Sequence, residues 1–379
     1  IDNSSGSATA NLTTVNSVAM PNNGSLSNRN IIINGEHKID QRNNGSAVTV
    51  NGGGFGGRKF VTDRFSIQHN GTASITGQQV TDTPAGYKNS LKMTVATAES
   101  AVDAADYLFL GYRLEGNDAS VLECGTSDAK EFTVSFWVKS SITGTYTLSF
   151  ANYSDNRSHR KEYTISSANT WEHKTVTLTA DTTGTWLTNN SGGLNVTWML
   201  LGGSNGVGAA NTWTGDIKNV TSNQTQWAST LGATFFITAI QLELGSVATE
   251  FEHKPITQDL ALSQRYFQTS FTSNPSTTNT DNNGVVLYNG GRTGDTTSFL
   301  GAAYIQLSPL MRTAPTVTIF DLATPRNTGK CHRHTYGYAG SNNQDTLVTD
   351  PNPSGFNVRS DSGHNANGMI FHWQCEAEL

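Results

Sequence analysis

The segment from Thr234 to Phe267 constrains the fold most, because its apolar pattern changes from that of a strand to that of a helix. Phe235–Leu244 carries apolar side chains on both parities: Phe236, Ile240, Leu242 and Leu244 on one, Ile237 and Ala239 on the other. This predicts a strand buried inside a sandwich. From Pro255 to Phe267 the apolar spacing becomes helical, with Asp259 in the first turn. A β-domain therefore ends here, a short helix follows, and a second β-rich domain begins.

The composition also favours strands over helices. Only 14% of the 379 residues are charged, whereas glycine occurs 37 times. Abundant Ser, Thr, Asn and Gly is typical of short strands joined by turns. This length predicts two domains. The fold class is therefore all-β.

A series of strand-like runs fills the region before the helix, without intervening helical patterns. These runs are Lys92–Ala96, Tyr107–Leu114, Phe132–Ser140, Thr145–Ala151, Lys161–Ser166, Trp171–Thr179, Val196–Leu201 and Phe235–Leu244. They predict a jelly-roll β-sandwich. The strand candidates after the helix are Gly284–Asn289, Phe299–Leu307, Pro315–Phe320, Lys330–Tyr338 and Met369–Leu379. The last of these alternates most clearly, so it should tie the end of the chain into a sandwich-like C-terminal domain.

Several fragments carry a resemblance to a known family. They are NRNIIINGEHKIDQR (28–42), VTDRF (61–65), FTVSFWVKSSITGTYTLSF (132–150), NTWEHKTVTLTADTTGTW (169–186) and QLELGSVATEFEHKPITQDLALSQRYF (241–267). In this order they resemble segments of bacteriophage tail-fibre and other virion structural proteins, in which the last segment closes a carbohydrate-binding-module-like jelly roll. Those proteins usually carry Cys where this chain has Ser263. The looser likeness of Pro309–Phe320 to phage-fibre terminal domains transfers no residue roles.

These patterns divide the chain into four parts. We expect an extended lead-in at 1–27, a jelly roll at 28–254 with its first strand within Asn28–Arg42, a connecting helix at 255–268 and a C-terminal tip domain at 269–379. The lead-in is too polar to form a core alone and should need partner chains. Because the sequence begins at Ile1 without Met, we expect it to be a piece of a longer protein, joined to other tail proteins through a preceding region.

Charge and cysteine content narrow the class further. A net charge of −6 and the absence of long Lys/Arg runs argue against nucleic acid as a partner. No stretch is apolar enough to predict a membrane span. Three cysteines form no disulfide framework; Cys331 and Cys375 either pair or, in a reducing cytosol, remain small buried residues.

Motifs for catalysis and metal binding are weak. Gly52–Gly57 and Gly202–Gly206 match glycine-rich and nucleophile-elbow patterns, but neither is followed by a helix pattern. Loop carboxylates are more often turn residues or calcium ligands than catalytic pairs. We expect that the protein is not an enzyme and binds no cofactor. Whether it binds a structural calcium ion stays open. His332 and His334 share one face of a strand, which predicts two exposed histidines. The alternative is that, in a trimer, these histidines from all three chains bind a metal ion on the three-fold axis.

The aromatic residues give the candidate binding sites. Trp137 and Trp171 lie in strand-like runs and are expected in the core. A loop group combines rings with polar side chains that bond sugar hydroxyls: Tyr153, Arg157, His159, Trp186, Asn211, Trp213 and Trp227. Alternatively, these rings plug the ends of the sandwich. A distal group offers a second receptor contact: Tyr336, Tyr338, His364 and Asn367.

The sequence thus predicts a homotrimeric tail-fibre protein, assembled in the host cytoplasm, that attaches the virion to host polysaccharide or lipopolysaccharide. Weak glycan contacts would gain strength from three-fold avidity. Two alternatives remain: a carbohydrate-binding module of a secreted glycosidase, and a structural capsid or tail appendage without sugar binding.

Overall fold

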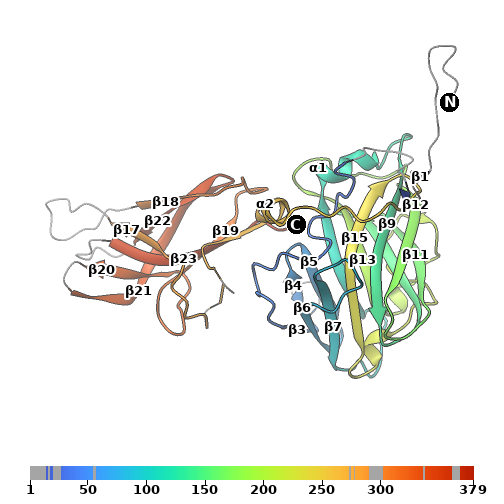
Figure 1. Cartoon of the computed structure of the whole chain (residues 1–379), viewed down its shortest axis with the longest axis horizontal. Helices are drawn as coiled ribbons and strands as arrows, with labels where there is room; N and C mark the ends of the chain where they lie inside the picture. Colours follow the sequence, from blue (N-terminus) through green and yellow to red (C-terminus); the bar gives the residue numbers. More distant parts are fainter. Residues whose placement is uncertain are drawn as a thin grey trace, which may run out of the picture.

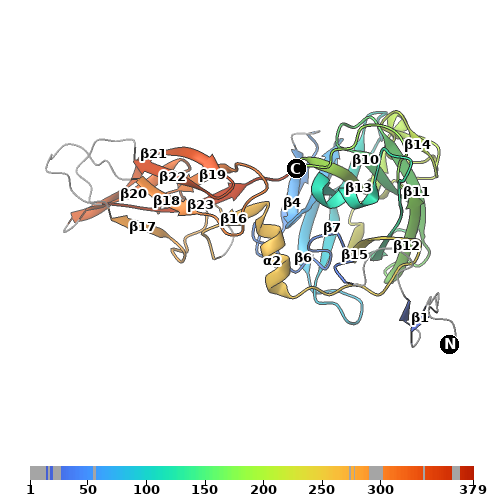
Figure 2. The same ribbon diagram turned by 90° about the horizontal axis from the view of Figure 1, so that it is seen from above.

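The computed structural model describes residues 14–15, 18–19, 27–53, 57–272, 275–276, 278–289, 302–335, 338–360 and 368–379. It shows a larger β-sandwich and a smaller, elongated β-domain joined through helix α2 (Ile256–Gln264) (Figures 1 and 2). Most of the expected lead-in lies outside the described residues. Within it, β1 (Thr14–Val15) pairs with β2 (Val18–Ala19). Among the described residues, no helix is long and apolar enough to cross a membrane.

Two antiparallel sheets form the sandwich. The first has the order β14 (Trp213–Thr214), β11 (Ser158–Ile165), β10 (Gly144–Asn152), β13 (Gly192–Gly202), β8 (Tyr107–Glu115), β5 (Phe65–Asn70) and β4 (Lys59–Thr62). The second has the order β12 (Glu172–Thr179), β9 (Glu131–Ser140), β15 (Thr234–Leu244), β7 (Ser90–Thr97), β6 (Ser74–Val80) and β3 (Val48–Asn51). Short helices α1 (Gly116–Ala119), η2 (Ser120–Leu122), η3 (Ser204–Gly206) and η4 (Trp227–Ser229) lie in the connections. The predicted all-β jelly-roll sandwich is confirmed.

One apolar core fills the space between the two sheets. In β9, Phe132, Val134, Phe136 and Val138 are fully buried, as their alternation predicts. Strand β13 is buried along most of its length, and Trp198 is among the largest side chains in the core. Burial of these side chains supplies the main driving force for folding.

A bulge in β15 explains why its apolar residues occupy both parities. The pairing of β15 with β9 shifts between Thr238 and Gln241, and Ala239 has a φ of 53°. A bulge adds one residue to a strand, so the inward parity changes from Phe235 and Ile237 to Ile240 and Leu242. Phe236 was predicted to share a face with Ile240 and instead lies on the outer face.

The strand expected within Asn28–Arg42 is absent from that described segment. The segment is still buried, because side chains bond its backbone in place of a strand ladder. The Asn34 side chain bonds the Ile39 backbone at N–H and C=O, and Asn30 donates to the Ile240 carbonyl. Apolar content therefore predicted burial correctly and the local conformation wrongly.

The smaller domain is also antiparallel. Its main order is β16 (Phe267–Thr269), β23 (Gly368–Glu376), β20 (Lys330–Thr335), β21 (Tyr338–Asn352), β22 (Gly355–Ser360) and β18 (Ala302–Gln306); β17 (Val286–Asn289) and β19 (Thr316–Phe320) also pair with β23. The sequence did not predict β21 and β22, which are rich in Asn, Asp and Gly. Cys331 and Cys375 are free and buried in this domain's core.

The last residues of the chain return to the sandwich, between the two domains (Figure 1). Leu379 belongs to the sandwich core, and the Ala377 amide donates to the Tyr266 carbonyl. Glu378 pairs with Arg42 and Arg64. These contacts fasten the smaller domain to the sandwich at a second point besides α2.

Candidate functional site: a groove on the seven-stranded sheet

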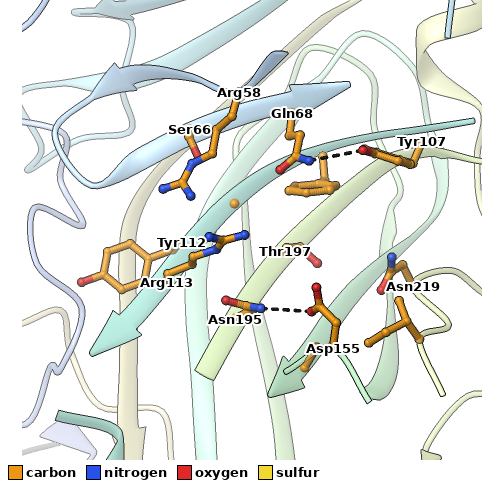
Figure 3. A pocket seen from close by; sticks show the side chains of 14 residues that line it. Arg58, Ser66, Gln68, Tyr107, Tyr112, Arg113, Asp155, Asn195, Thr197 and Asn219 are labelled. Atoms are coloured by element: carbon orange, nitrogen blue, oxygen red, sulfur yellow. Dashed lines mark hydrogen bonds between the residues drawn. The ribbon is translucent and has the colours of Figure 1, made fainter. Parts of the chain in front are cut away.

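A pocket of about 80 Å³, called here the groove, lies on the outer face of the seven-stranded sheet (Figure 3). Alternation in β8 builds its floor: Leu108, Leu110 and Tyr112 point into the core, so Tyr107 and Phe109 point outward. Neighbouring strands add the polar side chains Ser66, Gln68, Asn195 and Thr197. The groove therefore has an aromatic surface next to hydrogen-bonding groups.

The aromatic surface is held in a fixed arrangement. The Tyr107 and Phe109 rings stack with centroids 5.6 Å apart, and Gln68 Nε2 donates to the Tyr107 hydroxyl at 3.2 Å. The connection carrying Ile217 and Asn219 forms the opposite wall. A second hollow of about 230 Å³ shares Tyr107, Ile217 and Asn219 and lengthens the groove.

Asn195 gives the groove an unused acceptor. Its side chain is buried in β13, and its Oδ1 has no hydrogen-bond partner among the described residues. Its Nδ2 donates two long hydrogen bonds, to the Asn152 carbonyl at 3.4 Å and to Asp155 Oδ1 at 3.5 Å. Because an unsatisfied buried acceptor costs about 1–3 kcal/mol, this atom is suited to accept a hydrogen bond from a ligand hydroxyl.

Charged groups lie at one end of the groove. Burial raises the pKa of Asp155, while Arg113 and Asn195 oppose that shift. Burial and the neighbouring Arg113 lower the pKa of Arg58 to about 10. Arg58 and Arg113 both donate to the Leu379 carbonyl, so the C-terminal segment borders the groove. Tyr153, a predicted site residue, lies beside this end, with its ring 5.5 Å from the Arg113 guanidinium.

The structure brings most other predicted sandwich residues together at a different place. A cleft of about 620 Å³ lies along β11 and β12. It is lined by Arg157, His159, Asn211 and Trp213, and we call it the end cleft. Trp186 contacts Trp213 edge-on at 5.5 Å. Their indole N–H groups donate to the Thr183 and Thr179 carbonyls, which fixes both rings.

Some polar groups of the end cleft already form hydrogen bonds within the protein. Arg157 forms two hydrogen bonds to Asp181, at 2.6 and 2.9 Å. His159 lies 5.0 Å from the Trp213 ring, and burial, with help from Lys161 and Arg160, lowers its pKa to about 4. Its Nδ1 has no partner among the described residues. Because its pKa is about 4, the imidazole is neutral near pH 7.

Three tryptophans differ from their predicted places. Trp227 was a candidate for sugar contact, with a ring that plugs the sandwich as the alternative; η4 directs it into the core, where it is fully buried next to Phe235, in agreement with that alternative. Trp137 and Trp171 were expected in the core and are half-buried on the outer face. Strand position alone does not determine burial, because each face of a strand takes every second residue.

The groove residues Tyr107, Phe109, Gln68, Asn195 and Thr197 were not predicted as site residues. One signal was present: in YLFLGYRL (107–114), Tyr107 and Phe109 occupy the parity opposite to the leucines. The polar members come from distant strands, and only the fold brings them together.

The distal candidates are described only in part. Tyr336, His364 and Asn367 lie outside the described residues, and Tyr338 begins β21. His332 and His334 lie on β20, opposite Ile370 and Gly368 of β23. Within the described ranges, no group of three or more His, Cys, Asp or Glu could hold a metal ion.

No family model and no curated protein matches the sequence. Among solved structures, it is similar to an enzymatically active domain of tailspike protein 4 from bacteriophage CBA120 (13% identity over 55% of this chain, TM-score 0.30); the match covers only 22% of that domain. It is also similar to a Clostridium thermocellum family 11 carbohydrate-binding module bound to a mixed-linked tetrasaccharide (11% identity, 53% of this chain, 98% of the module, TM-score 0.28). A Cellulomonas fimi cellulose-binding domain gives 11% identity, 45% and 84% coverage and a TM-score of 0.24. These values are too low to define a family.

Proposed function

We propose that the protein binds glycans in the groove of the seven-stranded sheet. The observation that carries this proposal is Asn195 Oδ1, a buried acceptor without a partner among the described residues, close to the Tyr107–Phe109 aromatic surface. Aromatic rings stack on the apolar face of a sugar, while amide and carboxylate groups bond its hydroxyls. Asn195 and Asp155 supply such groups, and Thr197 adds a hydroxyl.

The wider role that we propose is attachment of a phage virion to its host. The protein would be a homotrimeric, non-catalytic tail-fibre component that binds cell-surface polysaccharide. This rests on the sequence resemblance of Gln241–Phe267 and the upstream fragments to tail-fibre segments. Three copies of a weak site would bind a repetitive glycan surface with high avidity.

Titration calorimetry with host-surface polysaccharides tests the groove. Asn195→Ala removes the acceptor, and Phe109→Ala removes an aromatic face. Each should weaken binding about fivefold or more, since one hydrogen bond contributes about 1 kcal/mol. Leu231→Ala, at a side chain that is 68% exposed, is the control. Normal binding by both groove variants, together with loss in Trp213→Ala, would transfer the site to the end cleft.

Light scattering tests the trimer. A solution mass of three chains that survives detergent supports an intertwined fibre. A monomer would contradict the fibre role for this chain while leaving the groove to be judged by calorimetry. Binding to no host polysaccharide at all would instead favour a structural appendage.

A further inference from the structure

A second pocket lies on the outer face of the other sheet. Its lining, called here the aromatic pocket, comes from β9, β12, β15 and two connections: Tyr87, Ser135, Trp137, His173, Ala239, Ala248, Thr249, Glu250, Phe251 and His253. Its volume is about 500 Å³. The groove and the aromatic pocket belong to opposite sheets of the sandwich, so one ligand molecule does not fill both.

Strand alternation presents the first wall of the aromatic pocket. Phe136 and Val138 are fully buried in the core, so Trp137 between them faces outward. His173 of β12 is its register partner, and their rings lie 5.3 Å apart. The wall is therefore an indole whose outer side remains half-buried rather than covered.

The bulge of β15 lies beside this wall. Ala239 lines the pocket and has a φ of 53°, a conformation that costs a residue with a side chain about 1–3 kcal/mol. The surrounding structure maintains it: the Ile240 amide donates to the Gly35 carbonyl at 2.9 Å, and Asn30 Nδ2 donates to the Ile240 carbonyl at 3.1 Å. Strained backbone and bulges of this kind concentrate at ligand sites.

The second wall is a group of three rings from two connections. Tyr87 lies 5.7 Å from Phe251 and 5.4 Å from His253, and Phe251 meets His253 edge-on at 5.1 Å. His253 Nδ1 lies 3.1 Å from Glu36 Oε2, which orients the imidazole. Ala239 and Ala248 contribute small side chains to the lining of the pocket.

The charge of the aromatic pocket is negative. Glu250 is exposed, and no ion-pair partner for its carboxylate occurs among the described residues. Burial raises the pKa of Tyr87, and Glu36 and Glu250 contribute to that rise. The lining residues include neither Lys nor Arg. A cationic ligand is therefore favoured over an acidic one.

We propose that the aromatic pocket is a second binding site, specific for a sugar that carries a protonated amine. The pyranose ring would stack on Trp137, and the ammonium group would contact the Tyr87 ring and bond Glu250. The Ser135 hydroxyl would bond one of the remaining sugar hydroxyls, whereas the Thr249 hydroxyl is already held by Glu243, Arg29 and Gln241. This site does not depend on glycan binding in the groove.

Calorimetry with two tetrasaccharides tests the proposal: one of β-1,4-linked glucosamine and its fully N-acetylated counterpart, at a pH where the free amines are protonated. The wild-type protein should bind the amine form about fivefold more tightly, since a hydrogen bond to a charged group contributes about twice as much as one between neutral groups. Glu250→Gln should abolish that preference. Trp137→Ala should weaken both ligands, and Asp128→Asn, a change at an exposed acid elsewhere, should change neither.

Three results would overturn the proposal. They are equal affinity of the wild-type protein for the two ligands, an unchanged preference in Glu250→Gln, and loss of amine-sugar binding in Asn195→Ala, which would place the ligand in the groove. Because Glu250 is exposed, its variant should fold normally, and circular dichroism checks Trp137→Ala. If Asn195→Ala binds the amine sugar normally, the sugar does not bind in the groove. The test of the aromatic pocket is then independent of the test of the groove.

Discussion

Arg64 and Glu378 form a buried ion pair between the sandwich and the C-terminal segment, across 314 positions of sequence. Their side chains are 1% and 6% exposed. The Arg64 guanidinium also lies 3.4 Å from the centre of the Tyr266 ring. Burial alone would raise the pKa of Glu378, but Arg64, Arg42 and Arg58 hold it below its usual range. The two domains are therefore joined by an ion pair that is buried away from solvent.

Glu378→Gln should strongly destabilise this junction. The substitution keeps the shape of the side chain but leaves Arg64 as a buried charge without its carboxylate. Removing one partner of a buried pair costs about 3–5 kcal/mol. Glu376→Gln is the matched control, because Glu376 is 43% exposed and forms a longer ion pair, at 3.7 Å, with Arg42. This substitution should lower the free energy of unfolding by less than about 1 kcal/mol. Urea unfolding measures both; similar losses would show that the buried pair is not special.

The junction marks a limit of sequence interpretation. The alternation of Met369–Leu379 predicted that the chain end is tied into a fold, and Leu379 is indeed buried. It gave no sign that Leu379 enters the sandwich core rather than that of its own domain. Periodicity reports which face of a strand is apolar, and it carries no information about a partner hundreds of residues away.

Acid should destabilise the protein through His37. This imidazole is fully buried, with Nδ1 2.9 Å from the Thr62 hydroxyl, and burial lowers its pKa to about 3. The unfolded chain protonates His37 near pH 6.5. Between these values the unfolded state binds more protons, so this contribution to stability is complete above about pH 6.5 and is lost as the pH falls toward about 3.

His37→Asn tests this contribution, because Asn tolerates the left-handed backbone at this position, where φ is 54°. Unfolding free energies of wild type and variant are compared at several pH values below neutrality. The stability advantage of the wild type should shrink as the pH falls. A constant difference across the range would rule out titration of His37 as the cause.

Trp227 and Trp213 should respond differently to truncation. Trp227 is fully buried, so Trp227→Ala should cost about 3–5 kcal/mol through the cavity it leaves. Trp213 is half-buried and loses mainly its hydrogen bond to Thr179, about 1 kcal/mol. Thermal unfolding compares the two, and equal losses would contradict the assignment of Trp227 to the core.

This contrast shows what the sequence could predict about binding residues. Segments rich in Asn, Gly and Thr led to the selection of Arg157, His159, Asn211 and Trp213, and these four residues do come together in the end cleft. Trp227 lies in a similar loop, yet one helical turn at its position directs the ring inward. The groove depends on register between β5, β8 and β13, which side-chain composition does not encode.

Gly35→Ala should disturb the bulge beneath the aromatic pocket. A Cβ at Gly35 would lie 2.1 Å from the Ile240 carbonyl oxygen, so the backbone of β15 or of residues 30–36 must move. Overpacking of this kind costs about 1–3 kcal/mol. Because Ala239 adjoins Ile240, the variant should also bind the glucosamine tetrasaccharide more weakly.

Gly215→Ala is the control: its Cβ would have only an ordinary contact, at 3.7 Å from Arg157, and stability should change by less than about 0.5 kcal/mol. Calorimetry and urea unfolding measure the two effects, and a destabilised variant with unchanged affinity would show that the bulge supports the fold but does not shape the pocket.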